Sequence, residues 1–414
     1  MTTTIMPPQR RRLRTPDTRP ATAPGTFAES GLDRRLVAAL RSRGLTAPFP
    51  IQAATLADAL AGRDILGRGQ TGSGKTLAFG LPLLDRLRSR RATRQRPLAL
   101  VLVPTRELAQ QVTTALAPYA QALGLRCATV VGGLSPRAQA AALARGAELL
   151  VATPGRLADL VHQGHCRLDM VEIAVVDEAD QMADIGFLPQ VTALLDQVLP
   201  GGQRMLFSAT LDAAVNKLVR RFLADPVTHS TDPPAAAVTT MAHHLLEVGP
   251  ADKAATVADI AARNTRTMMF VATKHGADRL ARHLTATGLL AAAIHGGKSQ
   301  GQRTRALEQF RNGALRVLVA TNVAARGVHI DDLDLVVNVD PPADGKDYLH
   351  RGGRTARAGR SGTVLTLVSA DQRRKIHHLM ASAGIQPHCT TVRPGHPALA
   401  PTAAHDAGRT RTVR

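Results

Sequence analysis

A glycine-rich stretch near the start of the chain has the residue types and the spacing of a phosphate-binding loop. From Gly69 to Thr76 it reads G-x-x-x-x-G-K-T. In such a loop the glycines let backbone N–H groups face phosphate oxygens, the lysine reaches the β and γ phosphates, and the threonine hydroxyl holds Mg²⁺. A strand-like segment precedes the loop and an apolar helix follows it, which favours this interpretation over a plain Gly/Ser turn. We therefore expect nucleotide contacts from Gly69, Gln70, Thr71, Gly72, Ser73, Gly74, Lys75 and Thr76.

A pair of acidic residues forms the second candidate centre. The apolar run at 173–176 ends in Asp177 and Glu178. Ligands bind at the carboxyl ends of parallel strands, and in phosphate-loop proteins the first acid there holds Mg²⁺. The pattern predicts Asp177 as a magnesium ligand together with Thr76, and Glu178 as the base that orients and deprotonates a water. The alternative is an acidic helix N-terminus that is favourable for dipole reasons alone.

The composition indicates a folded protein with a polyanionic partner. The chain has 414 residues, 44% of them hydrophobic, and a formal net charge of +20. Such a balance favours nucleic acid as the partner. Arg far outnumbers Lys, which is typical of bacterial proteins encoded by high-GC genes, so codon usage explains part of the excess. Because only 2% of the residues are aromatic, we expect contacts to phosphates and sugars rather than base stacking.

The cysteines and the N-terminus bear on the cellular location. Cys127, Cys166 and Cys389 are too far apart for a disulfide framework or a metal cluster, which fits a reducing compartment. The N-terminus lacks an apolar signal core, and no apolar run approaches the length of a membrane span. We therefore expect a cytoplasmic, monomeric protein with no membrane association.

Short apolar runs that alternate with helical stretches are the elements that must position these residues. Continuous Val/Leu/Ile runs indicate strands buried on both faces of a parallel sheet. The runs lie at 98–103, 128–131, 149–152, 173–176 and 205–207, and again at 245–248, 268–271, 291–294, 317–320, 335–339 and 363–368. The pattern predicts an α/β fold with two domains, 27–224 and 239–391. A flexible Pro/Ala-rich linker at 225–238 and disordered basic tails at 1–26 and 392–414 complete the expected organisation.

A run of arginines interrupts the first domain. The segment Arg86–Arg96 contains six arginines between a helix and a strand. A charge run usually marks a solvated face, which is the interpretation we favour. An additional RNA-contacting loop is the alternative.

The motifs and their order resemble those of the DEAD-box ATP-dependent RNA helicases. Asp177–Asp180 spells D-E-A-D, and the resemblance extends from about Phe27 to Val368. It implies two tandem RecA-like domains, each a parallel sheet flanked by helices, with ATP and Mg²⁺ as cofactors and RNA as the partner. Phe27 and Gln52 are similar to the adenine-recognition element of the family. The resemblance implies that the Gln52 amide both accepts from and donates to the adenine edge.

The resemblance also implies residues that contact RNA. In the first domain these are Thr105, Arg106, Gly133, Thr153, Pro154, Gly155 and Arg156. In the second domain they are Gln300, Arg303 and Thr321. Hydroxyls, arginines and backbone N–H groups at helix starts suit recognition of phosphates and of the 2′-OH. Such recognition of the RNA backbone does not depend on the base sequence.

Two further motifs resemble those that link hydrolysis to domain closure. Ser208 and Thr210 are similar to the coupling motif that hydrogen-bonds to the acidic residues, here Asp180. The segment from His350 to Arg357 resembles the final motif of the family and implies a catalytic role for His350, Arg354 and Arg357. The two arginines share one helix face and would reach across the cleft to the γ-phosphate, so that hydrolysis depends on closure. The alternative is a basic helix that binds RNA phosphate only, or nothing.

Two positions depart from aspartates that are usual in the family, namely Asn322 and His329. The second normally contacts the ATP ribose in the closed state, and a neutral histidine can make one hydrogen bond there. We therefore expect His329→Asp to change the KM for ATP more than kcat. A steady-state ATP titration in which kcat alone changes would contradict this. Leu45 and Phe49 replace the usual aromatic residue and threonine beside Gln52, so looser adenine packing is expected.

The expected function is an RNA-stimulated ATPase that binds RNA backbone across two domains and locally unwinds short duplexes. One alternative is an ATP-gated RNA clamp or chaperone that hydrolyses weakly because of Asn322 and His329. Another is a DNA-directed phosphate-loop motor. No sequence-reading module follows the second domain. Ribosome assembly, mRNA decay and cold adaptation are therefore equally compatible settings, with ribosomal or RNA-decay proteins as expected partners.

Overall fold

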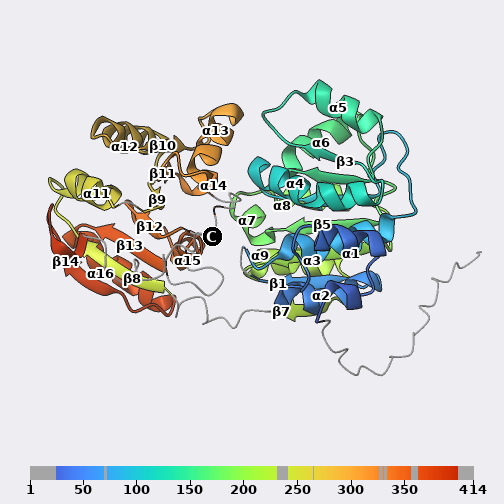
Figure 1. Cartoon of the computed structure of the whole chain (residues 1–414), viewed down its shortest axis with the longest axis horizontal. Coiled ribbons are helices and arrows are strands. Elements are labelled where there is room, and N and C mark those ends of the chain that lie inside the picture. The colour runs from blue at the N-terminus through green and yellow to red at the C-terminus, as the bar shows by residue number, and fades with distance from the viewer. Residues whose placement is uncertain are drawn as a thin grey trace, which may run out of the picture.

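Two parallel sheets, one in each half of the chain, confirm the expected α/β architecture (Figure 1). The computed structural model describes residues 25–69, 72–230, 241–263, 265–325, 330, 333–355 and 362–399. In Figure 1 the first half of the chain, coloured blue to green, forms one lobe, and the second half, coloured yellow to red, forms the other. Each lobe consists of one sheet with helices on both faces.

The first sheet has seven strands in the order β3-β4-β2-β5-β6-β1-β7, and its strand pairings are parallel. Its strands are β1 (Ile65–Arg68), β2 (Ala99–Leu102), β3 (Cys127–Val130), β4 (Leu149–Ala152), β5 (Ile173–Asp177), β6 (Gln203–Ser208) and β7 (Val227–Ser230). One face is covered by η1 (Phe27–Glu29), α1 (Arg34–Arg41), α2 (Pro50–Leu60), α3 (Lys75–Leu87) and α4 (Arg106–Ala122). The other is covered by α5 (Pro136–Ala144), α6 (Pro154–His162), α7 (Ala179–Asp184), α8 (Leu188–Leu195) and α9 (Ala213–Phe222).

The second sheet repeats this topology. Its order is β10-β11-β9-β12-β13-β8-β14, which is the order of the first sheet when its strands are numbered from its own start. Its strands are β8 (Met241–Glu247), β9 (Thr267–Phe270), β10 (Ala291–Ile294), β11 (Val317–Ala320), β12 (Leu335–Asn338), β13 (Gly362–Val368) and β14 (His388–Thr391). One face packs against α13 (Gln300–Arg311), α14 (Asn322–Ala325), α15 (Gly345–Gly352) and α16 (Ala370–Ser382). The other packs against α11 (Lys253–Ala261), α12 (Lys274–Ala286) and η2 (Pro397–Leu399).

Burial on both faces explains why the strands appear in the sequence as continuous apolar runs. In β2, Ala99 and Val101 lie in the core on one side of the sheet, whereas Leu100 and Leu102 lie in the core on the other. Every residue of this strand therefore leaves water, and the period-two pattern of a one-sided sheet is absent. Each predicted apolar run corresponds to one strand of the structure.

Two strands were missed by the sequence analysis, and two of the expected domain boundaries shift. β7 lies inside the expected linker and pairs with β1 at the edge of the first sheet. β14 pairs with β8 at the edge of the second sheet, and the chain beyond it continues to pack. Val392 and Leu399 are buried in the second core, so residues 392–399 do not belong to a disordered tail. The remaining residues of the expected linker, 231–238, and of the tails lie largely outside the described residues.

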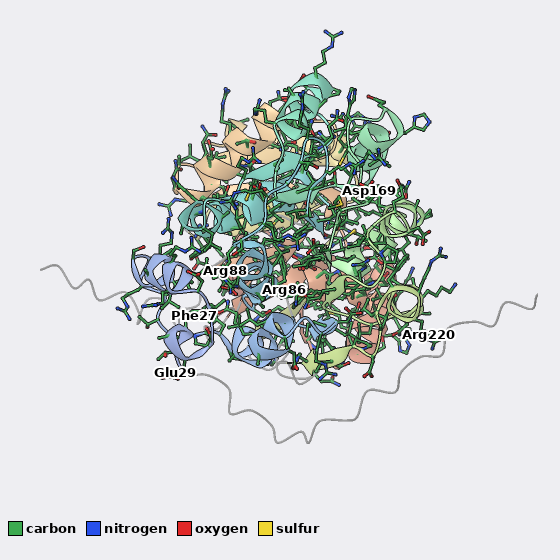
Figure 2. The ribbon with its side chains drawn as sticks, turned by 90° about the vertical axis from the view of Figure 1, so that its right-hand side faces the viewer. Phe27, Glu29, Arg86, Arg88, Asp169 and Arg220 are labelled. Carbon is green, nitrogen blue, oxygen red and sulfur yellow. The ribbon has the colours of Figure 1, made fainter. Side chains whose placement is uncertain are left out.

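The loop that contains the arginine run is attached to the first domain through carboxylates. Arg88 Nη1 lies 2.8 Å from Asp85 Oδ2, and Arg96 Nη1 lies 3.6 Å from Asp169 Oδ2. Arg90 pairs with Glu172. Figure 2, in which the first lobe faces the viewer, labels Arg88 and Asp169 on this surface. The pairing favours a solvated structural loop over an additional RNA-contacting loop.

No helix among the described residues is both long and apolar enough to cross a membrane. All three cysteines lie in the described part of the chain, and each is a free thiol. Cys166 is buried, Cys127 is half-buried and Cys389 is exposed.

Candidate nucleotide and nucleic-acid site

The phosphate-binding loop connects the end of β1 to the start of α3. Gly72 and Gly74 have φ values of 90° and 93°, in the left-handed region that favours glycine. A Cβ atom on Gly74 would also lie only 2.6 Å from Gln52 Nε2. The Lys75 ammonium is 5% exposed and donates to the Gly69 carbonyl oxygen at 3.0 Å. The two predicted contacts Gln70 and Thr71 lie outside the described residues.

The acidic motif meets this loop at the carboxyl end of β5. Lys75 Nζ lies 2.8 Å from Glu178 Oε1, and both side chains are buried. Glu178 has a φ of 54°, so the chain turns sharply between β5 and α7 at this residue. Burial opposes the charge on Lys75, but Glu178 and Asp177 more than offset this and raise its pKa. The structure thus brings together the lysine predicted to bind phosphate and the predicted base.

Asp177 is the first residue after the apolar part of β5 and is 2% exposed. Burial, opposed by Lys75 and reinforced by the neighbouring carboxylate Glu178, raises the pKa of Asp177 to about 7. A divalent cation would favour the charged form of such a carboxylate. Nearby in the loop, Ser73 Oγ is buried without a hydrogen-bond partner among the described residues. A buried carboxylate together with hydroxyl groups is the kind of oxygen ligand set that suits Mg²⁺, so the residues fit this ion.

The raised pKa of Asp177 predicts how stability depends on pH. Between its ordinary value of 3.8 and about 7, the folded protein binds more of this proton than the unfolded chain does, so stability falls as pH rises through that window. We expect Asp177→Asn to become more stable relative to the wild type by about 1 kcal/mol per pH unit over this range. Urea unfolding of the nucleotide-free protein at several pH values measures the difference. A difference that stays constant with pH would contradict the prediction.

The predicted adenine-recognition element is only partly as expected. Gln52 Nε2 donates to the Gly74 carbonyl oxygen at 3.0 Å, and Gln52 Oε1 accepts from Phe49 N at 2.9 Å. Phe27 is 2% exposed and packs in the first core, so its ring supports this region from inside rather than facing a ligand. The exposed ring beside Gly74 belongs to Phe49, which is 57% exposed. Sequence reasoning treated Phe49 only as a replacement.

The coupling motif contacts the acidic motif directly. The N–H and the hydroxyl of Thr210 both donate to Asp180 Oδ2 at 2.9 Å. Asp180 N donates to Ser208 Oγ at 3.2 Å, and that hydroxyl donates to the Thr210 carbonyl oxygen at 2.7 Å. Asp180 is fully buried, so these bonds hold its carboxylate in one orientation.

The final motif lies on α15 of the second lobe and faces the acidic motif of the first. His350 Nε2 lies 3.9 Å from Asp180 Oδ2. Arg354 is 5% exposed and lines a small cavity together with His350, Asn322 and Phe270. Figure 1 shows α14 and α15 on the side of the second lobe that faces α7 and α9. The predicted residues Arg357 and His329 lie outside the described residues.

Asn322, one of the two departures from the family pattern, has a specific partner. Its Nδ2 donates to Asp347 Oδ2 at 2.8 Å. The same carboxylate oxygen lies 2.9 Å from Arg351 Nη2. Arg351 also donates to Asn338 Oδ1 at 3.0 Å and lies over the Phe270 ring. The amide therefore belongs to a buried network that fixes α15 against the second sheet.

The first-domain residues predicted to contact RNA gather at the starts of α4 and α6. Thr105 is the N-cap of α4, and its hydroxyl accepts from Leu108 N at 3.3 Å. The Arg106 guanidinium packs so closely against Gly133 that a Cβ there would meet Arg106 Nη1 at 2.0 Å. Gly133 also has a φ of 74°. The positive φ favours glycine at this position, whereas the end of the flexible Arg106 side chain could move away from an added Cβ.

The second cluster of predicted RNA contacts begins at Thr153, the N-cap of α6, followed by Pro154 as its first residue. An added Cβ on Gly155 would meet nothing within 4 Å, so the backbone there is open to a ligand. Arg156 Nη1 donates to the Leu134 carbonyl oxygen at 2.9 Å. Backbone N–H groups at such helix starts suit phosphate oxygens.

In the second domain the structure gives two of the predicted RNA contacts a different partner. Gln300 Nε2 donates to Glu107 Oε1 at 3.0 Å, and Arg303 Nη2 lies 2.9 Å from Glu107 Oε2. Glu107 belongs to α4 of the first domain and is 6% exposed. Both side chains thus cross between the domains. Thr321 lies at the end of β11, where its N–H donates to the Ile294 carbonyl oxygen at 3.3 Å.

Glu107 and Lys346, which both make contacts between the domains, were not singled out by sequence reasoning. Lys346 Nζ lies 2.9 Å from Asp184 Oδ1 and 3.1 Å from Asp212 Oδ2, both in the first domain. Nothing in local spacing reveals such partners, because they are separated by more than a hundred residues. The position of Glu107 next to Arg106 inside a recognised motif is the only signal that would have pointed to it.

Comparison with known proteins matches both domains to helicase families. The DEAD/DEAH box helicase family matches residues 49–218, and the helicase conserved C-terminal domain matches residues 252–359. DEAD-box ATP-dependent RNA helicase 3A, chloroplastic, from Zea mays is 42% identical over 368 residues, which cover 86% of this chain and 49% of that protein. DEAD-box ATP-dependent RNA helicase 28 from Oryza sativa subsp. japonica is 40% identical over 87% of this chain and 46% of that protein. The chain spans about half the length of these relatives.

A solved structure with a similar arrangement is that of S. cerevisiae Dbp5 bound to RNA and ADP BeF3. The TM-score is 0.78 at 28% sequence identity, over 89% of this chain and 96% of that one. The similarity extends over both lobes, which supports the interpretation of the two sheets as tandem RecA-like domains. With two helicase domain matches in the expected order and the motifs assembled between the lobes, the chain belongs to the DEAD-box ATP-dependent RNA helicase family.

Proposed function

We propose that this chain is an RNA-stimulated ATPase that binds RNA backbone across its two domains and locally unwinds short duplexes. The observation that carries the proposal is the meeting of α15 with the acidic motif, where His350 of the second domain lies 3.9 Å from Asp180 of the first. This contact connects the acidic motif, which acts on a nucleotide, with α15, which responds to domain closure. The similarity to an RNA-bound relative supports RNA as the partner.

The nucleotide half of the mechanism rests on the phosphate-binding loop. Lys75 exchanges its contact with Glu178 for the β and γ phosphates when ATP binds, which releases the Glu178 carboxylate to orient and deprotonate a water. Gln52 recognises the adenine edge. Thr76 and Asp177 would hold Mg²⁺, which neutralises the charge that develops on the phosphates.

The second half of the mechanism is coupling. Asp180 is held by Ser208 and Thr210 on one side and faces His350 on the other. Closure of the second domain brings Arg354, and with it Arg357, to the γ-phosphate, so that hydrolysis requires both RNA and ATP. When the closed domains hold one RNA strand in a conformation that no longer fits A-form geometry, that strand loses its base-paired partner strand. Since DNA stacking is worth about 1.4 kcal/mol per step, one cycle opens only a few base pairs.

RNA-stimulated phosphate release tests the proposal against its alternatives. We expect hydrolysis to rise strongly with single-stranded RNA and little with DNA of the same sequence, because the RNA-facing motifs suit the 2′-OH. ATP-dependent RNA binding without stimulated hydrolysis would favour the clamp or chaperone instead. Equal stimulation by DNA would favour the DNA-directed motor.

The domain bounds, the oligomeric state and the cellular location complete the proposal. We infer ATP-binding and RNA-binding domains that begin near residues 27 and 239, a monomeric state, and a reducing, cytoplasmic location supported by three free thiols. The arginine-rich composition supports a bacterial origin of high-GC type. We infer ribosomal proteins or RNA-decay proteins as its protein partners.

A further inference from the structure

Lys346 lies between two carboxylates of the other domain. Its Nζ is 2.9 Å from Asp184 Oδ1 and 3.1 Å from Asp212 Oδ2. The lysine side chain is 26% exposed, and those of Asp184 and Asp212 are 23% and 39% exposed. One ammonium group thus bridges two acids in a partly dehydrated gap, where charge pairs are stronger than on an open surface.

The three residues belong to the elements that carry the reaction. Lys346 is in the first turn of α15, four residues before His350, and the two side chains therefore share a helix face. Asp184 ends α7, the helix that starts within the acidic motif. Asp212 is the N-cap of α9, two residues after Thr210 of the coupling motif, and its Oδ1 accepts from Ala214 N and Val215 N. Its carboxylate is therefore fixed before Lys346 approaches.

The contact is available only when the domains are together. In a separated first domain, Asp184, Asp212 and the buried Asp180 are carboxylates without this cation. In a separated second domain, Lys346 lacks both of these carboxylates. Burial opposes the charge on Lys346, but hydrogen bonds to Asp184 and Asp212 outweigh it and raise its pKa. Burial likewise opposes the charge on Asp212, but the N–H of Val215 and the Lys346 ammonium lower its pKa. Both partners favour their charged forms.

We propose that Lys346 is a positioning residue that holds the closed state by bridging Asp184 and Asp212, and thereby seats His350 and Arg354 over the nucleotide. The proposal rests on the function proposed above and adds a residue that touches neither nucleotide nor RNA. A group that interacts only in the closed state shifts the equilibrium toward closure by its interaction free energy. Its loss weakens the coupling between RNA and ATP rather than either binding site.

Charge reversal tests the proposal. In Lys346→Glu we expect the RNA concentration for half-maximal ATPase stimulation to rise about 10-fold or more, with nucleotide affinity in the absence of RNA unchanged. Lys375→Glu is the matched control, since it changes the net charge equally at an exposed position of the same domain. Asp184→Lys should resemble Lys346→Glu. In the double variant Asp184→Lys with Lys346→Glu, the rise in the RNA concentration for half-maximal stimulation should be at least half reversed on a logarithmic scale. If the two substitutions acted independently, their effects on this concentration would add.

Small-angle X-ray scattering separates this proposal from the proposed function. With RNA and a non-hydrolysable ATP analogue, the wild type and Lys375→Glu should be more compact than Lys346→Glu, and the double variant should regain compactness. Equal compactness and equal RNA dependence of Lys346→Glu and Lys375→Glu would overturn the role of Lys346 while leaving the helicase proposal intact. A wild type that RNA does not stimulate would overturn the helicase proposal. The scattering comparison between variants would still decide the role of Lys346.

Discussion

Glu178→Gln is expected to lower kcat for RNA-stimulated ATP hydrolysis about 10²–10⁴-fold while ATP still binds. The amide keeps the size of the side chain but cannot take a proton from the attacking water. Because Glu178 contacts Lys75 Nζ at 2.8 Å in a buried site, the change also removes a charge that stabilises the ammonium. Asp177 remains next to Lys75 and limits this loss.

Single-turnover hydrolysis and nucleotide binding together check this prediction. Glu308→Gln provides a matched control, because Glu308 is exposed on α13 and away from the acidic motif. Wild-type kcat in Glu178→Gln would assign the water to another residue. A loss of ATP binding equal to the loss of kcat would instead mean that Glu178 serves only to hold Lys75. Thermal unfolding of each variant shows whether the buried pair is needed for folding.

The central strands could be predicted from sequence because burial on both faces leaves a composition that no other element shares. The apolar run at 99–102 illustrates this, since alternate residues of β2 enter the two cores. The edge strands β7 and β14 have only one neighbour each, and their residues are mostly polar and all half-buried or exposed. The opposite edge strands, β3 and β10, were predicted because their runs at 128–131 and 291–294 are mostly apolar, whereas the mostly polar residues of β7 and β14 leave no comparable signal.

The site was predictable where its chemistry depends on local spacing. The phosphate-binding loop and the acidic motif each lie within one turn between a strand and a helix, and the structure joins them through Lys75 and Glu178. Contacts between domains have no such local signature. Gln300 and Glu107 are separated by 193 positions, and Lys346 and Asp184 by 162. Residue type also fails to tell which way a side chain faces, as the buried ring of Phe27 shows.

Replacing Arg354 by Lys is expected to lower RNA-stimulated kcat about 10³-fold, because an arginine that stabilises the transferring phosphate is worth about 10³–10⁵ in rate. Lysine keeps the charge but loses the planar fork that can contact two phosphate oxygens at once. Arg354 is buried beside His350, Asn322 and Phe270, a location that suits a group presented to a nucleotide rather than to solvent.

The same variant decides between a nucleotide role and an RNA role for this arginine. If Arg354 acts on the γ-phosphate, ATP-dependent RNA affinity should change little. Any hydrolysis that occurs without RNA should be unaffected, because it would not use the second domain. Arg374→Lys, at an exposed position of α16, is the control for an arginine-to-lysine change in the same domain. A weaker RNA affinity with preserved kcat would identify Arg354 as a contact to RNA phosphate. Hydrolysis would then depend on closure through the contacts of His350 and Lys346 with the first domain, together with those of Gln300 and Arg303 to Glu107.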